Sequence, residues 1–561
     1  MADSLKFERG AAKALPYTVQ TVSSSLASHK NRLRKERGLL FALVPLWRKT
    51  WNGDPLKSVL LIAVTLRVLA AVFSKGYAFH DEHFDVIRVA QNWLDGIPNW
   101  IADPVPPNHS MFYAGINAAF LYISEAIGIT DPQSKMLAVR LVHAFYSVLI
   151  VYYGFKITER LSNTANATLV GLMLATLWFM PFLSVQNLVE MVCMPPLLAA
   201  FYRIVKKEVS NMDWLIAGGL IGLAFTFRLH VVIFAGGVGI IMLYRKQFLQ
   251  AVVFSAGFLT VAFSVTGVID WFFWEYPFQS IVSYFVFNTS HAYDFSTGPV
   301  YRFFLTVMGF TVPPISLLLL YGYIKSWKVS NEMWLAATLF FVIHSIFPNK
   351  QERFILPFFP FFISLGIICW NEFLVRSSYW PKHRRLLKGI WMFFWCVNIL
   401  TAIALSLSYS KKDRIAPLSY LSTKSDLEAL VIESSSNIKP VPEYYLGGIA
   451  GLNDDEVRSL NKAHGLNKEE IKVIYRKPNT KTVNTLKSEI EQNGKIPNYV
   501  IFKKSDHLEE RKRELISIFT NKKLVKIQEI APSAMDQVQH FFNPRVHKNR
   551  KSYIYKIVPV N

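Results

Sequence analysis

Apolar runs long enough to cross a membrane recur along most of this chain and limit what it can fold into. They fall near 57–75, 111–128, 137–155, 166–183, 188–204, 213–227, 230–244, 247–267, 302–324, 332–347, 354–374 and 386–409. A bilayer core about 30 Å thick needs about 20 apolar residues in a helix. Only 18% of the residues are charged, against about 25% in a typical soluble protein. The pattern predicts a multi-pass α-helical membrane protein.

The charged residues are biased toward Lys and Arg, with a formal net charge of +22. Such an excess occurs in nucleic-acid-binding proteins. Here, however, the basic residues lie between the apolar runs, which favours cytoplasmic loops and contact with anionic lipid. We therefore expect a lipid bilayer as partner and no nucleic acid. The segment 1–56 carries the basic stretch 29–37 and is predicted to be cytoplasmic.

Basic pairs recur at every second connection after residue 156, which predicts the sidedness of the loops. The opposite face then holds 76–110, 185–190, 228–230, 268–301, 349–354 and the region after 410. The N-terminal segment and Lys156 can both be cytoplasmic only if one of the segments 111–128 and 137–155 does not cross the membrane. We expect 111–128 to be re-entrant or to lie on the surface; two crossings within one run would satisfy the parity equally well.

The last part of the chain, 411–561, is polar and rich in Lys. Strand-like runs occur at 430–433, 471–475, 499–502 and 552–558, and helical stretches at 454–463, 483–492 and 505–520. This alternation predicts a small soluble α/β domain on the non-cytoplasmic face. The expected organisation is a cytoplasmic segment 1–56, a membrane domain 57–410 that contains the acidic loop 76–110, and the domain 411–561.

Two adjacent carboxylates, Asp81 and Glu82, follow the first apolar run. Ionisable groups at a membrane boundary are costly unless they find partners or carry a function. A carboxylate in this position can act as a general base that deprotonates a hydroxyl, and its neighbour can hold it in place. The alternative is a solvated loop with incidental charge. The next residues, 86–94, have apolar spacing near 3.6 and predict an amphipathic helix on the membrane surface.

Cationic residues are expected on the same face as the acidic loop, and they can hold a leaving phosphate. They are Arg228, His230, Arg302, Lys350 and Arg353. Each can instead be an interfacial anchor whose side chain snorkels to water, and Glu352 can simply pair with Arg353. In the aromatic loop 270–277, Trp271 and Tyr276 can stack on a sugar or belong to an interfacial aromatic belt.

Common cofactor and metal motifs are missing from the sequence, which has no GxxxxGK[ST], HExxH or CxxC. His80 and His83 bracket the acid pair, but two His residues on a loop are a weak metal signal. We expect neither a metal nor a cofactor. The three cysteines, Cys193, Cys369 and Cys396, all lie in apolar runs, so the C-terminal domain has no disulfide framework.

These motifs together resemble those of the dolichyl-phosphate-mannose mannosyltransferases of GT-C fold, the family that builds GPI anchors and lumenal N-glycan precursors. The family has a His-Pro-Asp-Glu-type motif after its first span. Here residues 80–85 read His-Asp-Glu-His-Phe-Asp, without the Pro and with Asp in the place of a frequent Gln. The family's His-Lys-Glu-x-Arg-Phe motif corresponds to 349–354, Asn-Lys-Gln-Glu-Arg-Phe, in which the His is lost. The resemblance covers roughly 57–410.

The resemblance implies an inverting, metal-independent mannosyltransferase of GT-C fold with Asp81 as base and Glu82 in support. His80, Arg228, His230, Arg302, Lys350, Glu352, Arg353, Trp271 and Tyr276 are then expected to bind substrate. The donor is a polyprenyl-phosphate sugar and the acceptor a lipid-linked glycan. The site would face the lumen of the endoplasmic reticulum in a eukaryote or the periplasm in a bacterium.

Two alternatives stay open. One is a bacterial relative that uses an undecaprenyl-phosphate sugar on a cell-envelope glycolipid. The other is a transporter of a lipid-linked molecule. Transporters place ionisable residues near mid-membrane, often in repeated halves. Here the ionisable cluster lies at span ends, which favours the enzyme.

Overall fold

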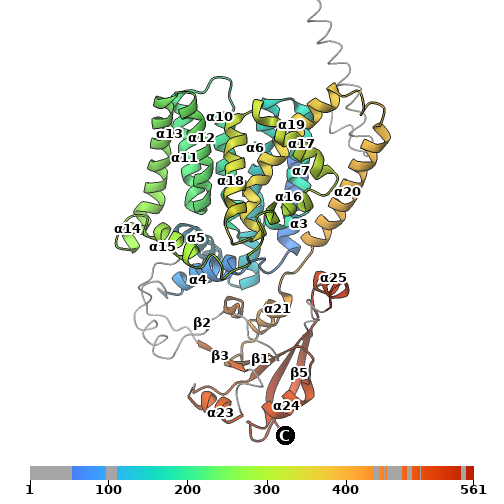
Figure 1. Ribbon diagram of the computed structural model, residues 1–561. Coiled ribbons are helices and arrows are strands. Elements are labelled where there is room, and N and C mark those ends of the chain that lie inside the picture. Colours follow the sequence, from blue (N-terminus) through green and yellow to red (C-terminus); the bar gives the residue numbers. More distant parts are fainter. Residues whose placement is uncertain are drawn as a thin grey trace, which may run out of the picture.

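The computed structural model shows a helical bundle with a smaller sheet domain beneath it (Figure 1). The structure describes residues 53–96, 110–434, 441–447, 449–450, 470–476, 483–492, 494–544 and 551–560. Most of the basic segment 1–56, residues 97–109 of the acidic loop and the helix expected at 454–463 therefore lie outside the described residues.

Among the described residues, five helices are long and apolar enough to cross a membrane. They are α3 (Pro55–Phe73), α6 (Pro132–Leu161), the continuous stretch of α13 (Phe248–Ala262), η4 (Phe263–Gly267) and α14 (Val268–Phe273), η6 (Glu352–Phe358) with α19 (Phe359–Arg376), and α20 (Arg384–Ser406). In the span that contains α19, 94% of the most apolar stretch is buried, against 28% in α20, which runs along the outside of the bundle (Figure 1). The expected multi-pass helical architecture is confirmed.

Other apolar runs fold as shorter or broken helices. The shorter helices are α7 (Thr164–Thr176), α8 (Met180–Leu183), α9 (Val189–Val192), α10 (Met194–Ile204), α11 (Asn211–Phe227), η3 (Leu229–Val231) with α12 (Val232–Tyr244), and α18 (Asn331–Ile346). α16 (Arg302–Phe310) and α17 (Ile315–Lys325) with η5 (Ser326–Lys328) form a pair bent by 117°. Proline removes a backbone donor and clashes with the preceding turn, and Pro181, Pro195 and Pro313 lie at these breaks.

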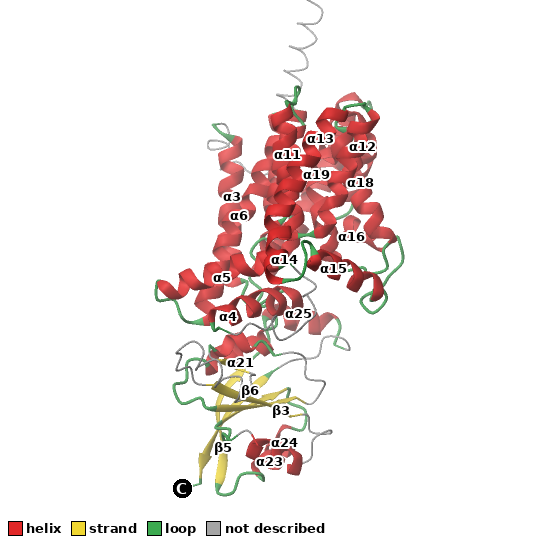
Figure 2. Cartoon of the chain, turned by 90° about the vertical axis from the view of Figure 1, so that its left-hand side faces the viewer, coloured by secondary structure: helices red, strands yellow, loops and turns green. Residues whose placement is uncertain are grey.

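A layer of short helices lies across the lower end of the bundle (Figure 2). It contains η2 (Glu82–Ile87), α4 (Arg88–Leu94), α5 (Met111–Ala126) and α15 (Gln279–Ser290). The stretch 86–94 is helical, as its spacing predicted. Its first turn is a π-helix, in which the Arg88 N–H donates to the carbonyl of His83, five residues back. The placement of α5 agrees with the expectation that 111–128 does not cross.

The basic connections lie away from this layer. α6 begins beside the sheet domain, where the Tyr444 hydroxyl donates to the Pro132 carbonyl at 3.5 Å. Its 30 residues span about 45 Å at about 1.5 Å per residue, so Arg160 lies at the opposite end. There the guanidinium of Arg160 stacks over the Tyr202 ring at 3.8 Å. This arrangement agrees with the sidedness expected from the basic pairs.

The C-terminal part contains a six-stranded mixed sheet in the order β2-β3-β1-β4-β6-β5. Its elements are α21 (Lys412–Leu421), β1 (Ala429–Ser434), η7 (Glu443–Leu446), β2 (Ile449–Ala450), β3 (Glu470–Arg476), α23 (Val483–Gln492), β4 (Tyr499–Lys503), α24 (Leu508–Ile516), β5 (Lys522–Ile530), α25 (Ala534–Phe542) and β6 (Ser552–Pro559). β1 is parallel to β3 and β4, whereas β6 is antiparallel to β4 and β5. The four predicted strands, the helix at 483–492 and, as α24, the helix within 505–520 are confirmed; β2 and β5 were not predicted.

The two faces of the sheet have separate cores, because successive side chains of a strand point to opposite faces. On one face, Val431 packs with Leu486 of α23 and Leu515 of α24. On the other face, Leu430 and Ile432 join a core that also includes Phe84 and Ile87 of η2, the helix that begins in the acidic stretch of the membrane domain. The acidic loop and the sheet are therefore built on one shared hydrophobic core.

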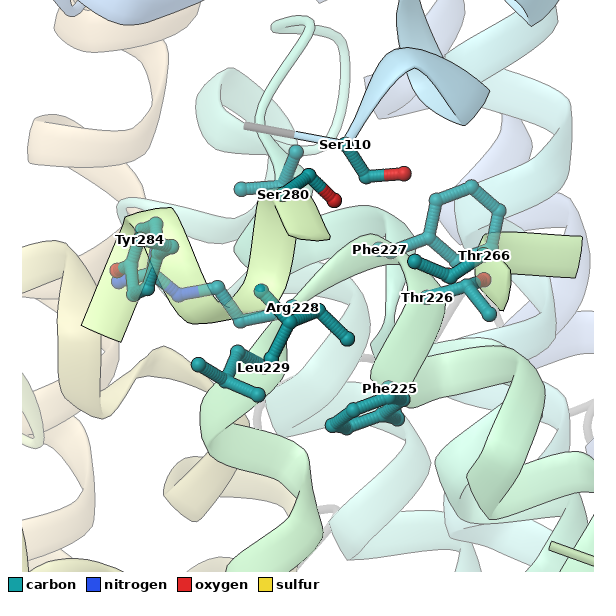
Figure 3. Close-up of a pocket in the computed structure, with 11 residues that line it drawn as sticks. Ser110, Phe225, Thr226, Phe227, Arg228, Leu229, Thr266, Ser280 and Tyr284 are labelled. Carbon is teal, nitrogen blue, oxygen red and sulfur yellow. The ribbon is translucent and has the colours of Figure 1, made fainter. Parts of the chain in front are cut away.

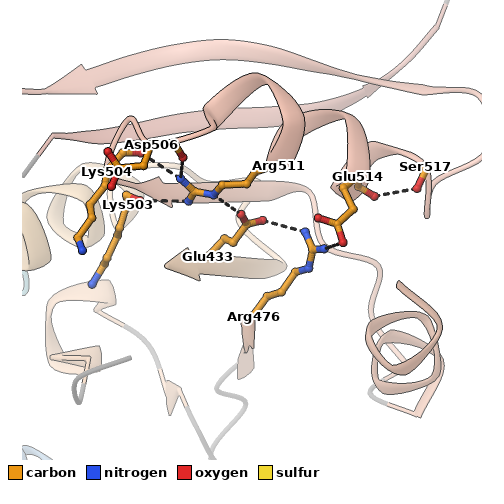
Figure 4. Close-up of polar contacts among 8 residues, drawn as sticks. All are labelled: Glu433, Arg476, Lys503, Lys504, Asp506, Arg511, Glu514 and Ser517. Atoms are coloured by element: carbon orange, nitrogen blue, oxygen red, sulfur yellow. Dashed lines mark hydrogen bonds and ion pairs between the residues drawn. The ribbon is translucent and has the colours of Figure 1, made fainter. Parts of the chain in front are cut away.

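At the carboxyl end of β1, a buried carboxylate is held between two arginines (Figure 4). Glu433 accepts from Arg476 Nη1 at 3.0 Å and from Arg511 Nε at 2.6 Å. Arg511 also donates to the carbonyls of Lys503, Lys504 and Asp506 at 3.0–3.2 Å, and Arg476 pairs with Glu514 at 2.6 Å. Burial raises the pKa of Glu433, and the two arginines oppose that shift. The carboxyl ends of parallel strands often bind ligands, but here Arg511 fills that position.

Candidate active site

The acidic stretch brings its two carboxylates into different environments. Asp81 ion-pairs with Arg353, 272 positions later in the chain, while its side chain stays 36% exposed. Glu82 is buried, and its Oε2 accepts the backbone N–H groups of Ala78 at 3.1 Å and Phe79 at 3.2 Å. Burial raises the pKa of Glu82 to about 7. Asp81 is thus accessible to a substrate, and Glu82 fixes the turn that presents it.

The Asp81 partner Arg353 belongs to a larger charged cluster. Fully buried Glu190, on α9, lies 3.7 Å from Arg353 Nε and 3.3 Å from Arg228 Nη2. The two guanidinium groups also stack on aromatic rings, Arg228 over Phe354 at 4.7 Å and Arg353 over Phe79 at 5.1 Å. We call Asp81, Glu190, Arg228 and Arg353 the charged cluster. Its members come from four segments that are far apart in the sequence.

Glu190 was not among the predicted site residues. The chain breaks after α7, because Leu177 is extended, and Pro195 and Pro196 keep α9 from continuing as a straight span. The irregular stretch between them places Glu190 in the first turn of α9. The available signal was an acidic residue at the start of the apolar run 188–204, since such residues inside membranes are usually functional.

A polar chain supports the acidic stretch from the bundle side. The Asn187 amide donates to the Glu82 carbonyl at 3.4 Å, and its Oδ1 accepts the Tyr113 hydroxyl at 2.5 Å. The Tyr113 oxygen also lies 2.6 Å from His143 Nε2. From the C-terminal side, Lys411 Nζ donates to the carbonyls of Tyr77 and Ala78 at 3.2 and 2.8 Å. The acidic turn is thus held by groups from both parts of the molecule.

A small cavity of about 40 Å³ lies beside the charged cluster (Figure 3). Arg228 and Leu229 line it, with Val189, the neighbour of Glu190. Tyr284 of α15 closes another side, and Figure 3 shows the Arg228 side chain directed toward it. Arg228 therefore borders both a fixed carboxylate and a space that a ligand group can enter.

The other three predicted cations lie in three different environments. His230 packs near the cluster, with its ring centroid 6.1 Å from Phe354 and 5.0 Å from His344. Lys350 is buried and donates to the carbonyls of His344, Ser345 and Phe347, so it caps the end of α18. Arg302 instead pairs with Glu352 at 2.7 Å on the rim.

The remaining predicted residues lie at the surface. His80 is exposed and stacks on Phe84 at a centroid distance of 4.3 Å. Trp271 is 63% exposed and Tyr276 is 44% exposed. No contact within the described structure joins these two aromatic side chains to the charged cluster, so their substrate role stays a prediction.

His83, beside the acid pair, is buried in an aromatic stack. Its ring lies 4.7 Å from Tyr77 and 5.3 Å from Tyr445 of η7, with both pairs nearly parallel. Burial lowers the pKa of His83 to about 3, so the ring is neutral at physiological pH. Within the described residues, no group of three or more His, Cys, Asp and Glu side chains is arranged to hold a metal ion.

Comparison with known proteins identifies the family. A model described as the Alg9-like mannosyltransferase family matches residues 58–429, about two thirds of the chain. The chain belongs to this family. The match covers the spans, the acidic stretch and every member of the charged cluster, and it ends at the first residue of β1.

One relative of this Alg9-like chain is GPI mannosyltransferase 3 of Yarrowia lipolytica, 23% identical over 336 residues. That match covers 54% of this chain and 60% of the relative, less than two thirds of its length.

Among solved structures, the chain is similar to ArnT from Cupriavidus metallidurans, in the apo state (TM-score 0.54) and bound to undecaprenyl phosphate (TM-score 0.53). Both matches are 12% identical and cover 89% of this chain and 97% of ArnT. At this identity the likeness concerns the fold alone, and it confirms the expected GT-C architecture.

Proposed function

We propose that this protein transfers mannose from a polyprenyl (dolichyl) phosphate carrier to a hydroxyl group of a lipid-linked glycan. The observation that carries the proposal is the charged cluster, in which the accessible carboxylate of Asp81 pairs with buried Arg353 and buried Glu190 lies between Arg353 and a second buried guanidinium group, that of Arg228. Membership of the Alg9-like mannosyltransferase family supports the sugar and the reaction class.

The proposed reaction is a single displacement at the anomeric carbon. Asp81 accepts the proton of the acceptor hydroxyl, and the hydroxyl oxygen forms the new bond to the anomeric carbon. The bond from that carbon to the phosphate oxygen breaks, and its electron pair leaves with the polyprenyl phosphate. Attack from the face opposite the leaving group inverts the anomeric configuration, and no covalent enzyme intermediate is needed.

Arg353 and Arg228 are placed to stabilise the leaving phosphate. Guanidinium groups bind phosphate oxygens in a bidentate manner, and stabilisation of developing negative charge is usually a large catalytic term. Glu190 carries no hydrogen bond from either arginine, and Arg228 Nη2 makes no hydrogen bond in the structure. Arg228 is therefore held by the charge of Glu190 while its Nη2 keeps donor capacity for an incoming phosphate, whereas Arg353 is also held by hydrogen bonds to Gln351 and Asp81.

The proposal extends to the acceptor and the membrane. GPI mannosyltransferase 3 suggests a GPI precursor or another lipid-linked oligosaccharide as acceptor. In a eukaryote the protein would lie in the endoplasmic reticulum membrane with the acidic stretch and the sheet domain in the lumen. In a bacterium it would lie in the inner membrane with both on the periplasmic face.

The direct test is transfer by purified protein in nanodiscs, with labelled polyprenyl-phosphate-mannose and a panel of lipid-linked acceptors. We expect Asp81→Asn to lower kcat by about 10²–10⁴-fold while donor binding is retained. Asp95→Asn, on the same acidic loop but outside the cluster, is the matched control and should stay near wild type. Transport of intact donor across the bilayer without labelled product would instead favour a transporter, and an active Asp81→Asn variant would remove Asp81 as base.

A further inference from the structure

α25 carries an apolar face that no other described element covers. At about 100° per residue, its residues Ala534, Met535, Val538, Phe541 and Phe542 fall within an arc of about 120°. Phe541 is 81% exposed and Phe542 is 79% exposed. Within the described part of the chain, no helix or strand packs extensively against α25. Two adjacent, almost fully exposed phenylalanines are costly in water.

The helix is nevertheless defined at its start. The Asp536 N–H donates to Ser533 Oγ at 3.2 Å, while the Ser533 N–H and hydroxyl donate to the Asp536 carboxylate at 3.1 and 2.7 Å. This reciprocal arrangement is a capping box. A helix of nine residues is still marginal in water without tertiary packing, so α25 needs a surface to pack against.

The position of α25 indicates which surface that is. In both views α25 lies close to the level of α4, in the layer that closes the lower end of the bundle, and in Figure 1 this level is just below the lower end of α20 (Figures 1 and 2). α20 has the length and composition of a membrane span, so its lower end marks the edge of the bilayer. α25 therefore lies at the height of the lipid head groups.

The charge of the neighbouring sequence also favours the membrane surface. The sequence after the helix continues with Arg545, His547, Lys548, Arg550 and Lys551, and basic residues next to an amphipathic helix attract anionic lipid. We infer that α25 is a membrane-surface anchor, which inserts Val538, Phe541 and Phe542 into the interfacial region of the bilayer and seats the sheet domain against the membrane domain.

The test is the depth of a spin label in nanodiscs made of phosphatidylcholine and phosphatidylserine. Phe541→Cys and Glu510→Cys are labelled separately in the full chain, with exposed Cys396 replaced by Ala. Glu510 is the matched control, since it is also exposed (74%) but lies on α24, on the opposite side of the sheet domain from the bundle (Figure 2). Val538→Cys, on the same face of α25, serves if Phe541→Cys does not fold.

Oxygen concentrates in lipid, whereas a nickel chelate stays in water. We expect a label at 541 to collide more often with oxygen than with the nickel chelate, and a label at 510 to collide more often with the nickel chelate. The ratio of the two should differ several-fold between the sites. Equal, water-like ratios at 541 and 510 would overturn the anchor. A label at 541 that is shielded from both reagents would also overturn it, because protein, such as a second copy of the chain, would then cover the face.

Discussion

Two carboxylates in this molecule are each buried between two arginines, and they differ in how tightly they are held. Glu433 in the sheet domain lies 2.6 and 3.0 Å from its arginines, in hydrogen-bonding geometry. Glu190 in the membrane domain lies 3.3 and 3.7 Å from its arginines, without a hydrogen bond. The partners of Glu433 are further bonded to carbonyls and to Glu514, whereas those of Glu190 border a cavity and the accessible Asp81.

The difference is the one expected between a structural ion cluster and the phosphate site that we propose. A buried ion pair offsets its desolvation cost only when its geometry is good and the remaining donors are satisfied. The Glu433 cluster meets the first condition, with a hydrogen bond from each arginine, and Arg511 also donates to three carbonyls, whereas within the described structure Arg476 Nε and Nη2 make no hydrogen bond. The Glu190 cluster meets neither, and a bound phosphate would supply the missing acceptors.

The comparison is tested most strongly by removing each central carboxylate. Glu433→Gln should destabilise the sheet domain by about 3–5 kcal/mol, because buried Arg511 loses its carboxylate partner and Arg476 keeps only Glu514, which is 37% exposed. Glu190→Gln breaks no hydrogen bond and leaves Arg353 with Asp81, although buried Arg228 loses its carboxylate partner, so we expect a smaller loss of stability than for Glu433→Gln, together with a fall in transfer activity. Unfolding curves and initial rates of both variants decide this. Equal stability losses would show that the two clusters serve the same purpose.

Changing one arginine in each cluster to lysine is the next test. Lysine keeps the charge but loses the planar fork, so Arg353→Lys should lower kcat by about 10²–10³-fold with little change in thermal stability. Arg511→Lys should lower the thermal stability with little change in kcat, because Arg511 donates to Glu433 and to three carbonyls at once. An Arg353→Lys variant with wild-type donor KM and kcat would make Arg353 an interfacial anchor.

A smaller effect is expected from pH, through Glu82 and His83. Between the ordinary pKa of Glu82, 4.5, and that of His83, 6.5, folded Glu82 keeps a proton that the unfolded chain releases. Over the same range, His83 stays neutral in the folded protein, whereas the same side chain binds a proton in the unfolded chain. The Glu82 proton lowers the free energy of unfolding as pH rises, and the neutral His83 ring raises it. The two slopes against pH therefore cancel in the wild type.

Single substitutions should expose these two slopes. Glu82→Gln leaves His83 alone, so stability should fall by about 1.4 kcal/mol for each unit of acidification below pH 6.5. His83→Phe leaves Glu82 alone and should give the opposite slope, a loss of stability as pH rises from 4.5 toward 7. Unfolding midpoints at several pH values between 5 and 6.5 measure both; parallel curves for wild type and variants would contradict the assignment.

The smallest effect is expected at the rim, where Arg302 and Glu352 are 32% and 48% exposed. An exposed ion pair is typically worth less than about 1 kcal/mol. Glu352→Gln should therefore change the folding equilibrium constant by no more than about fivefold, and kcat/KM by no more than about fivefold. A loss of two or more orders of magnitude in kcat/KM would instead place this pair at the substrate, as the family motif implies.

Much of this architecture was predictable because membranes impose regular patterns on sequence. The length of the apolar runs identified the spans, and short strand-like runs identified β1, β3, β4 and β6. β5 escaped prediction because five of its nine residues are polar, as is common in edge strands that avoid aggregation.

The candidate site was only partly predictable. Asp81, Arg228 and Arg353 were expected because they are ionisable residues at span ends. Their pairing was not, because a contact across 272 positions depends on tertiary packing rather than on spacing. Glu190 was missed because it begins an apolar run that reads as a span, and only the broken path of α8 and α9 brings it under the two arginines.

The shared core of the acidic loop and the sheet has a consequence for biosynthesis. β6 is the last of the described strands to be translated, yet it lies between β4 and β5. Its Ile554 belongs to the same core as Phe84 and Ile87, and its neighbour Ser552 donates to the Asp413 carbonyl at 2.9 Å. A ribosome-bound chain that has inserted every span therefore still lacks one wall of the core beneath Asp81. The acidic turn therefore reaches its final form only after β6 has been made, so the transfer activity proposed for it would have to wait for the sheet domain.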